Sequence, residues 1–234
     1  MVYVKIGLPL HQILFMTSLA EENYLKAIYA LNLGDSTAST NAIAERLDTK
    51  ASSVTDMLKR LNEKNLVNYL KYQPATLTTK GQAIAIDVIR KHRLWEFFLV
   101  EKLKFGWDEV HEIAEQLEHI QSPALINRLD EFLNSPKFDP HGDPIPNKEG
   151  KITERHEQVL AEMDLNDHAH IVGVKEHSNS FLQYLDAMQL VLGTKIKLIN
   201  RFEFDQSVVI DLIDSAKQIT ISHEISKNLY IKTI

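Results

Sequence analysis

Two imidazoles and two carboxylates recur at helical spacing between Trp107 and Gln121. They are His111, Glu115, Glu118 and His119, at offsets 0, 4, 7 and 8. At about 100° per residue these positions share roughly one quadrant of a helix, and Val110, Ile113, Leu117 and Ile120 fall on the other side. Nitrogen and oxygen donors grouped in this way suit a divalent transition ion, but a solvated acidic face would have the same composition. The stretch therefore predicts a metal site or, as its alternative, a charged surface.

A second pair of donors lies upstream. His92 and Glu96 are four residues apart, so they share one face of a second helix. Two such helices packed together could enclose one or two ions. The rival interpretation is an enzyme, either a metallo-hydrolase or a di-iron oxidase. It is disfavoured because the His-Glu-x-x-Glu sequence at His111 lacks the second histidine of the zinc-protease motif, and no pair of Glu-x-x-His motifs is present. We therefore expect a binding protein and not an enzyme.

The composition is that of an ordinary globular chain. It has 234 residues, 44% of them hydrophobic, with only 8 Gly and 7 Pro, which allows one sizeable core or a few smaller ones. The absence of cysteine excludes disulfides and thiolate metal sites and fits a reducing cytoplasm. No apolar run reaches the roughly 18 residues of a membrane span. Residues 1–15 lack a signal-peptide cleavage site and contain Gly7 and Pro9, so we expect an N-terminal extension on a cytoplasmic protein with no membrane partner.

The following segments predict three helices and two short strands, in the order of a winged helix-turn-helix. Apolar residues recur at helical spacing after Ser18, in SLAEENYLKAIYALNL. Thr40 is the expected N-cap of a short helix, NAIAERL, and a turn at Asp48 and Thr49 separates it from a third helix, ASSVTDMLKRLNEKN. The sequence LVNYLKYQPATLTTKG then reads as two strands around a turn, which predicts the wing.

Charge is distributed unevenly along the chain. The net charge is −6, yet residues 40–80 contain seven Lys or Arg and four acidic residues, a local excess of +3 that leaves −9 for the remainder. A basic segment on an acidic chain suits a small DNA-reading module, although a solvated helix pair would also show it. We expect the third helix to lie in the major groove. The candidate DNA contacts are Lys50, Ser52, Ser53, Thr55, Asp56, Lys59, Arg60, Lys71 and Tyr72, with Val54, Met57, Leu58 and Leu61 in the core.

The rest of the chain divides into a helical part and a β part. A capping box that starts at Thr79 predicts a long helix through about Leu103, and Ser122 is the expected N-cap of the helix ALINRLDEFLN. Residues 135–153 contain four Pro and two Gly, which predicts a boundary. Beyond it, after one turn of helix near Glu157 to Met163, five alternating segments predict the strands of a small barrel with one helix, FLQYLDAMQL. These segments are AHIVGVKEH, TKIKLINRFEF, SVVIDLI, QITISHEI and LYIKTI.

Taken in order, these segments resemble the diphtheria-toxin-repressor family of metal-dependent transcriptional regulators. Seven of them agree with the family in kind, order and spacing, from about Ser18 to the C-terminus: EENYLKAIYAL, IAERLDTKASSVTDMLKRLNEKNLV, KYQPATLTTKG, RKHRLWEFFL, DEVHEIAEQLEHIQS, HGDPIPNKEG and QYLDAMQLVLGT. The resemblance implies a mainly α fold with a C-terminal β domain. Its parts would be an N-terminal extension (1–15), a winged helix-turn-helix DNA-binding domain (16–80), a helical metal-binding and dimerisation domain with a Pro-rich linker (81–153), and an SH3-like, FeoA-type barrel (154–234).

The resemblance also implies two neighbouring metal positions. The primary position would take Asn23 from the first helix together with Glu115, Glu118 and His119. The ancillary position would take His92, Glu96 and His111, with further ligands from the barrel, for which His177 and Ser180 are the candidates and Glu176 an adjacent one. The other histidines, among them His11, His141, His156, His168, His170 and His223, are expected to be surface or core residues.

Three positions depart from the patterns of the family. Asn23 stands where iron-responsive members have Met and manganese-responsive members have Asp, so its ligand atom would be a neutral amide oxygen. Lys26 stands where manganese-responsive members are acidic, and its charge would repel a second ion there. Glu115 stands where iron-responsive members have Cys, and it supplies a hard oxygen. We therefore expect Mn(II), with Fe(II) as a close alternative and Zn(II), Co(II) and Ni(II) as ions that bind in vitro.

The function that the resemblance implies is a metal-dependent transcriptional repressor. As a homodimer loaded with Mn(II) or Fe(II), it would bind palindromic operator DNA and control metal-homeostasis genes. Ion binding would tie the first helix, through Asn23, to the helix of Glu115 and His119, and acid would weaken the response because ligating histidines must be neutral. Two alternatives remain open: a winged-helix DNA-binding protein whose metal site is purely structural, and a metal-dependent hydrolase.

Overall fold

The computed structural model describes residues 17–33, 37–153 and 158–234, so the expected N-terminal extension lies outside the described residues. The chain forms two compact units. Unit 1 comprises Met1–His92, Glu115–Ser135 and Pro146–Lys151, and unit 2 comprises Arg93–Ala114, Pro136–Ile145 and Ile152–Ile234. The border between the units therefore falls inside the long helix and inside the Pro-rich segment that the sequence suggested as a boundary.

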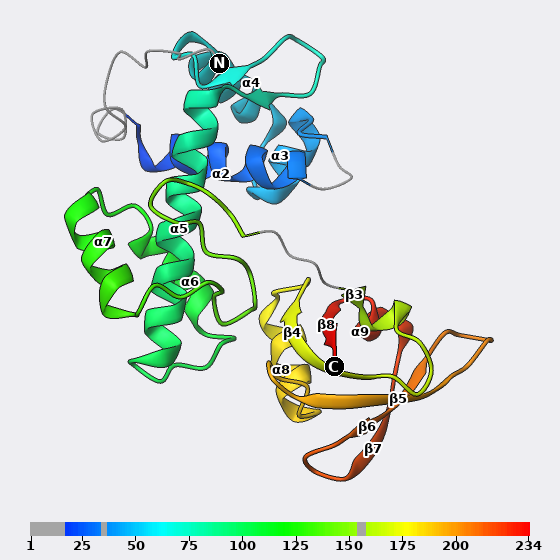
Figure 1. Ribbon diagram of the computed structural model, residues 1–234. Coiled ribbons are helices and arrows are strands. Elements are labelled where there is room, and N and C mark those ends of the chain that lie inside the picture. The colour runs from blue at the N-terminus through cyan, green and yellow to red at the C-terminus, as the bar shows by residue number, and fades with distance from the viewer. Residues whose placement is uncertain (1–16, 34–36, 154–157) are drawn as a thin grey trace, which may run out of the picture. The chain divides into compact units, whose positions relative to one another are not determined.

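Unit 1 contains the predicted winged helix-turn-helix (Figure 1). Helices α2 (Leu19–Leu33), α3 (Thr40–Arg46) and α4 (Ala51–Glu63) precede a hairpin of two antiparallel strands, β1 (Val67–Asn68) and β2 (Thr76–Leu77). The side chains of Leu25, Ile43 and Leu58, one from each helix, are fully buried. On α4 the buried residues are Val54, Met57, Leu58 and Leu61, as predicted, so the polar residues lie on the opposite side of the helix.

Two predicted helix caps are wrong by one residue. Ser39, and not Thr40, is the N-cap of α3, because Ser39 has the extended backbone of a cap and its side chain accepts a hydrogen bond from the amide of Ala42 at 3.2 Å. The long helix α5 (Thr79–Glu101) begins where predicted, but Thr78 Oγ1 accepts from the amide of Gly81 at 3.1 Å. Each sequence offers two adjacent hydroxyl residues, and backbone geometry decides which one caps.

Helix α6 (Val110–Leu117) is shorter than the predicted stretch from Trp107 to Gln121. It begins later because Trp107 belongs to the hydrophobic core of unit 2, where its indole Nε1 donates to Asp186 Oδ2 at 2.9 Å. It ends before Glu118 and His119, which lie in the turn that follows. Helix α7 (Pro123–Phe132) then starts at the predicted cap, since Ser122 Oγ accepts from the amide of Leu125 at 3.4 Å.

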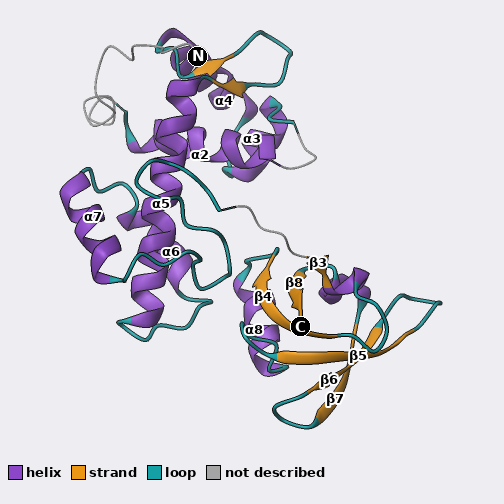
Figure 2. Ribbon diagram, in the orientation of Figure 1, coloured by secondary structure: helices purple, strands orange, loops and turns teal. Residues whose placement is uncertain are grey.

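Unit 2 contains a six-stranded sheet that is antiparallel throughout, in the order β3-β8-β4-β5-β6-β7 (Figure 2). Its strands are β3 (Gln158–Val159), β4 (His168–Val174), β5 (Lys195–Arg201), β6 (Val208–Leu212), β7 (Lys217–Ile221) and β8 (Leu229–Thr233), with α8 (Asn179–Ala187) between β4 and β5. Alternate residues of the central strands, such as Ile196 and Leu198 or Val208 and Ile210, are buried. The sheet is the predicted SH3-like, FeoA-type part of the chain.

One local prediction in unit 2 is confirmed and one is wrong. Within the described residues, the turn of helix expected near residues 157–163 is the three-residue 3-10 helix η1 (Leu160–Glu162). The segment QITISHEI is not one strand, because β7 ends at Ile221 and the side chain of Ser222 caps a short helix, α9 (His223–Ser226), by accepting from the amide of Ile225. A serine directly after alternating residues was a cap signal that the strand pattern masked.

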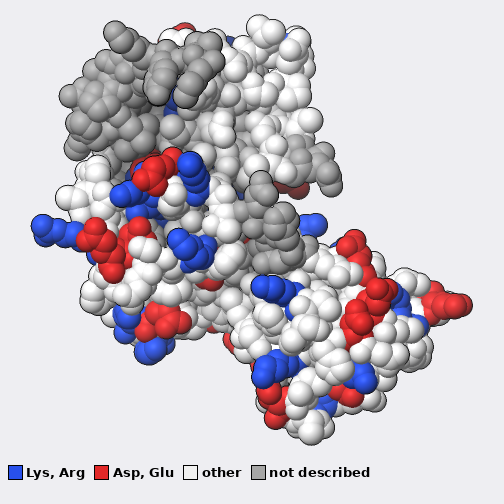
Figure 3. Space-filling model, in the orientation of Figure 1, with Lys and Arg blue, Asp and Glu red and all other residues white. Residues whose placement is uncertain are grey.

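Charges of both signs are interspersed on the face drawn in Figure 3. Within the described ranges, no helix combines the length and the apolar character that crossing a bilayer requires.

Candidate metal centre

Glu96 is the centre of a buried polar cluster in unit 2. It lies on α5, and only 2% of its surface is exposed. Its two carboxylate oxygens face different histidines: Oε1 is 3.4 Å from Nδ1 of His111, and Oε2 is 3.6 Å from Nδ1 of His141. A buried carboxylate is stable only with compensating partners, and here imidazoles from two other segments provide them.

The loop Pro136–Ile145 adds a second buried acid, Asp139. Its Oδ1 accepts hydrogen bonds from the amides of His141 and Asp143, both at 2.9 Å, so this carboxylate sets the shape of its own loop. Its Oδ2 lies 3.5 Å from Nε of Arg93. One ligand atom from each of Glu96, Asp139 and His141 lies within 4.8 Å of the others, and all three residues are buried. Two acids and an imidazole thus converge on one small volume.

A glycine allows this loop to reach strand β4. Gly142 has φ +84°, and a Cβ on it would lie 2.2 Å from the carbonyl oxygen of Val172, well inside contact distance. The amide of Val174 donates to the carbonyl oxygen of His141 at 2.9 Å. The position of His141 therefore depends on the absence of a side chain at Gly142.

The electrostatics of the cluster favour bound protons. Burial, reinforced by the carboxylate of Glu96, raises the pKa of Asp139 to about 7. Burial lowers the pKa of His141, but Glu96, together with Asp139 and the carbonyl of Trp107, outweighs it and raises this pKa to about 9. Two acids so close together do not both ionise readily unless a cation compensates their charge. The donor set, carboxylate oxygens and imidazole nitrogens, fits a divalent transition ion that would supply the compensating charge in place of the protons.

His177, a predicted barrel ligand, lies next to the cluster. Its ring stacks on that of His141 with centroids 4.9 Å apart, and its Nε2 is 3.3 Å from the carbonyl oxygen of Val174. Burial lowers the pKa of His177, which favours the neutral, ligating form. The two neighbouring candidates are engaged locally: Glu176 accepts from the amide of Ser178 at 2.8 Å, and the hydroxyl of Ser180 lies 3.5 Å from that of Ser178.

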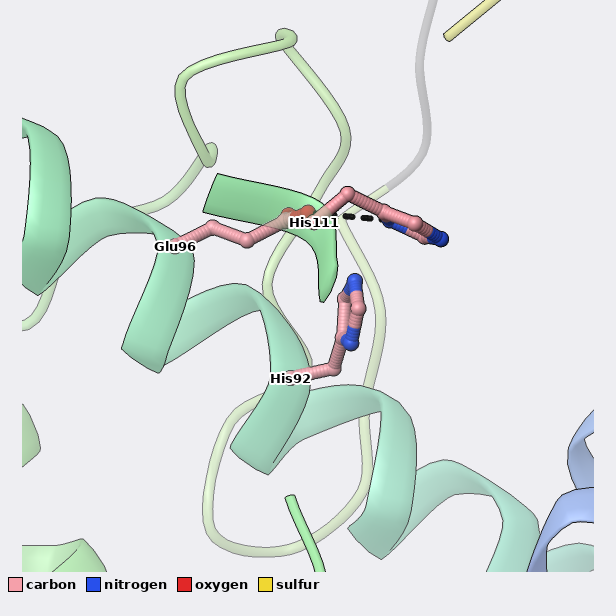
Figure 4. A group of neighbouring side chains, drawn as sticks. All are labelled: His92, Glu96 and His111. Atoms are coloured by element: carbon pink, nitrogen blue, oxygen red, sulfur yellow. Dashed lines mark hydrogen bonds and ion pairs between the residues drawn. The ribbon is translucent and has the colours of Figure 1, made fainter. Parts of the chain in front are cut away.

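His92 and Glu96 do share one face of α5, as predicted. Ligand atoms of His92, Glu96 and His111 also lie within 4.8 Å of one another, and Figure 4 shows the two α5 side chains extending toward His111. Nδ1 of His92 is 2.6 Å from Oε2 of Glu118. A carboxylate on one ring nitrogen of a histidine orients the ring and leaves the other nitrogen for a ligand. Glu96 is thus common to two candidate groups.

The predicted primary group is assembled differently. Oxygens of Glu118, which is fully buried, lie 2.7 and 2.9 Å from the ammonium of Lys26, and Glu115, with a half-exposed side chain, lies 3.5 Å from the same ammonium. His119 uses Nδ1 to bond Glu22 at 2.7 Å, while its Nε2 is 3.7 Å from Glu118. Oδ1 of Asn23 is buried without a hydrogen-bond partner among the described residues. A lysine therefore holds the carboxylates that were predicted to hold an ion.

The candidate DNA-contacting residues of α4 and its N-cap, Lys50, are largely exposed. Lys50, Ser52, Ser53, Asp56, Lys59 and Arg60 are exposed, and Thr55 is half-buried. Asp56 pairs with Lys59 at 3.2 Å, and Thr55 Oγ1 donates to the carbonyl oxygen of Ala51 at 3.0 Å. In the wing, the ammonium of Lys71 lies 4.8 Å from the ring centroid of Tyr72, whose surface is 90% exposed.

Sequence reasoning did not single out Asp139 and His141 as site residues. They lie in residues 135–153, which were interpreted as a boundary because this segment contains four prolines and two glycines. The signal that could have identified them is the Asp-x-His pair followed directly by Gly142, where a side chain would clash with the backbone of Val172.

Three family models match consecutive parts of the chain. The iron dependent repressor N-terminal DNA binding domain matches residues 16–75, the iron dependent repressor metal binding and dimerisation domain matches residues 78–147, and the FeoA domain matches residues 158–233.

Among curated proteins, the iron-dependent repressor IdeR of Mycobacterium leprae is 40% identical over 125 residues, which is 53% of this chain and 54% of that protein. The match thus spans about half the length of the mycobacterial relatives. The diphtheria toxin repressor of Corynebacterium glutamicum is 30% identical over 190 residues, covering 76% of this chain and 83% of that protein. Among solved structures, a manganese-dependent transcriptional repressor in complex with manganese is 31% identical with a TM-score of 0.81, covering 92% of this chain and all of that one. ScaR with bound Zn²⁺ is 30% identical with a TM-score of 0.73, covering 92% and 99%.

Proposed function

Because the chain belongs to the iron-dependent repressor family, we propose that it is a metal-dependent transcriptional repressor whose response centres on Glu96. The observation that carries the proposal is the convergence of Glu96, Asp139 and His141 in a buried volume. The surroundings raise the pKa of Asp139 to about 7 and that of His141 to about 9, so both groups hold a proton more readily than in water. Such a site is stable without an ion at low pH and gains affinity for a cation as protons leave.

The residues that would hold the ion are Glu96, Asp139 and His141. His111, His177 and His92 are the further candidate ligands, either of this ion or of a second one that also uses Glu96. A divalent cation supplies positive charge that two buried carboxylates share. Carboxylate and imidazole donors suit Mn(II) and Fe(II), and the absence of thiolates removes a preference for softer ions. We propose Mn(II) as the physiological ion, with Fe(II) as the nearest alternative, and expect Zn(II), Co(II) and Ni(II) to bind in vitro.

The proposed response uses the continuity of α5. Glu96 lies on the helix that begins directly after wing strand β2, so fixing Glu96 restrains the helix that follows the wing. His111 and the loop of Asp139 come from separate segments, and a shared ion would restrain them together with α5. The metal-bound and DNA-bound forms then favour each other by thermodynamic linkage.

The proposed target is double-stranded DNA with a palindromic sequence, bound by a homodimer in the cytoplasm. The exposed hydroxyls of Ser52 and Ser53 near the start of α4 suit base edges or phosphates, and Lys59 and Arg60 suit phosphates. A dimer with two-fold symmetry presents two such helices to half-sites one helical turn apart. Sedimentation equilibrium of the full chain tests the dimer.

The test of the function is a selection followed by a titration. Mn²⁺-loaded protein selects from a pool of random duplexes, and fluorescence anisotropy then measures affinity for the recovered duplex in Mn²⁺ and in EDTA. We expect an inverted repeat and at least about a tenfold tighter Kd with Mn²⁺. Glu96→Gln should bind DNA equally with and without the ion, while Glu101→Gln, an exposed residue at the end of the same helix, should behave as wild type. Equal affinity of the wild-type protein in both buffers would rule the switch out.

A purely structural metal site is the second candidate, because the cluster lies among buried residues of unit 2. Far-UV circular dichroism with and without EDTA separates the two. Loss of DNA binding with an unchanged spectrum supports the switch, whereas loss of secondary structure supports the structural role.

A further inference from the structure

The ammonium of Lys26 lies against two carboxylates that the resemblance implied as ligands of the primary ion. The ammonium contacts both oxygens of Glu118, at 2.7 and 2.9 Å, and one oxygen of Glu115 at 3.5 Å. Glu118 has no exposed surface, so its charge cannot be balanced by water. Although burial opposes ionisation, the pKa of Glu118 is lowered because His92 and Lys26 stabilise the carboxylate.

The surroundings of Glu118 otherwise look prepared for a cation. Nδ1 of His119 bonds Glu22 at 2.7 Å and its Nε2 lies 3.7 Å from Glu118, which is the arrangement of a ligating histidine oriented by a carboxylate behind it. Asn23 Oδ1 is a buried acceptor with no partner among the described residues. The donors predicted for an ion are therefore present, but the charge they hold is an ammonium.

An ammonium and a divalent ion cannot share these carboxylates. Both would lie within ordinary bonding distance of Glu118, and their mutual repulsion at that separation is strong in a site shielded from water. The ammonium also belongs to the chain, so it does not depend on the concentration of any ion.

We propose that Lys26 is a resident cation that replaces the ion of the predicted primary site, so that this site ties α2 to the turn after α6 without metal. The contact continues beyond Glu118, because the second oxygen of this carboxylate lies 2.6 Å from Nδ1 of His92. Lys26 thereby also holds the carboxylate that orients His92. The number of ions per subunit is then one lower than the complete set of donors suggests, and the metal response rests on the Glu96 cluster alone. The role of the Glu96 cluster in the metal response rests on the proposed function, whereas the exclusion of an ion by Lys26 does not.

The test counts Mn²⁺ ions per subunit by equilibrium dialysis with metal analysis, on the full chain. The variants are Lys26→Glu and Lys26→Met. The matched control is Lys64→Met, which removes a lysine that pairs at 2.7 Å with Glu21, also on α2, outside the site. Thermal unfolding monitors whether each variant is folded. We expect Lys64→Met to bind as many ions as wild type, and Lys26→Glu to bind one more per subunit. Adding His119→Gln to Lys26→Glu should remove the extra ion.

Should Lys26→Met fail to fold, Lys26→Glu together with its His119→Gln partner still decides the matter. If wild type and Lys26→Glu bind the same number of ions, or if the extra ion survives His119→Gln, the proposal is overturned. Glu96→Gln in the same assay separates this result from the proposed function. If the wild-type protein binds no ion while Lys26→Glu binds one, the proposed metal response at Glu96 is wrong and the replacement of an ion by Lys26 is supported. If Glu96→Gln loses an ion and Lys26→Glu gains none, the metal site at Glu96 is supported and the replacement of an ion by Lys26 is wrong.

Discussion

Replacing Glu96 by glutamine should remove most of the stability that protonated His141 contributes to the metal-free fold. The pKa of His141 is raised from 6.5 to about 9, and after burial, which lowers it, Glu96 is the largest cause. At about 1.4 kcal/mol per pKa unit, the full shift corresponds to roughly 3 kcal/mol. Asp139 and the carbonyl of Trp107 also raise this pKa and remain in the variant, so we expect a loss of about 2 kcal/mol.

The pH dependence follows from the direction of the shift. A histidine whose folded pKa exceeds its unfolded pKa contributes stability that is complete below about pH 6.5 and is lost as the pH rises through about 9. Asp139, with its pKa raised to about 7, acts in the same direction, because its protonated form also favours the fold. The difference between wild type and Glu96→Gln should therefore be largest near pH 6 and approach zero, or reverse, near pH 10.

The assay is urea unfolding of EDTA-treated protein at several values of pH between 6 and 10, followed by circular dichroism. Glu101→Gln is the control, since this residue is exposed on the same helix and should change stability by less than about 0.5 kcal/mol at every pH. A loss for Glu96→Gln that is constant across this range, or that grows with pH, would refute the charge pairing described for His141.

Other substitutions and conditions probe separate parts of the structure. Gly142→Ala should cost at least about 3 kcal/mol of unfolding free energy, because strain at positive φ adds to a clash with the Val172 carbonyl; Gly193→Ala, also at positive φ but with open space around it, should cost only about 1 kcal/mol. Mn²⁺ affinity should rise about tenfold per pH unit between pH 7 and 8.5, as His141 gives up its proton; calorimetry that shows no pH dependence would exclude His141 as a ligand. Lys59→Ala should weaken binding to all duplexes alike and reduce the slope of log Kd against log salt by about 1, and an unchanged slope would remove Lys59 from the phosphate contacts.

The helical part of the fold was predictable because its signals are local. The apolar spacing of α4 identified all four of its buried residues, and Ser122 marked the start of α7. Errors arose where tertiary packing overrides periodicity. The indole of Trp107 is drawn into the core of unit 2, which shortens α6 and leaves Glu118 and His119 outside the helix on which their spacing was first interpreted.

The grouping of side chains at the candidate site was predictable where they share a helix and not where a loop brings them together. His92 and Glu96 follow from a spacing of four, and the structure groups them with His111. Asp139 and His141 have no periodic signal, because their approach to Glu96 depends on long-range contacts between the loop and β4. The pairing of Lys26 with Glu118 joins residues 92 positions apart, and only the family comparison drew attention to Lys26 at all.

The two oxygens of Glu96 couple His111 and His141, which are far apart in the sequence, because each histidine contacts a different oxygen of the same carboxylate. With Oε1 assigned to His111 and Oε2 to His141, a change at either imidazole redistributes charge on the same carboxylate. Combined substitutions at these positions will not add, so evolutionary drift at one of them alters which replacements the other can accept. Lineages that vary the metal preference of this protein are therefore expected to exchange residues 111 and 141 in concert while Glu96 stays unchanged.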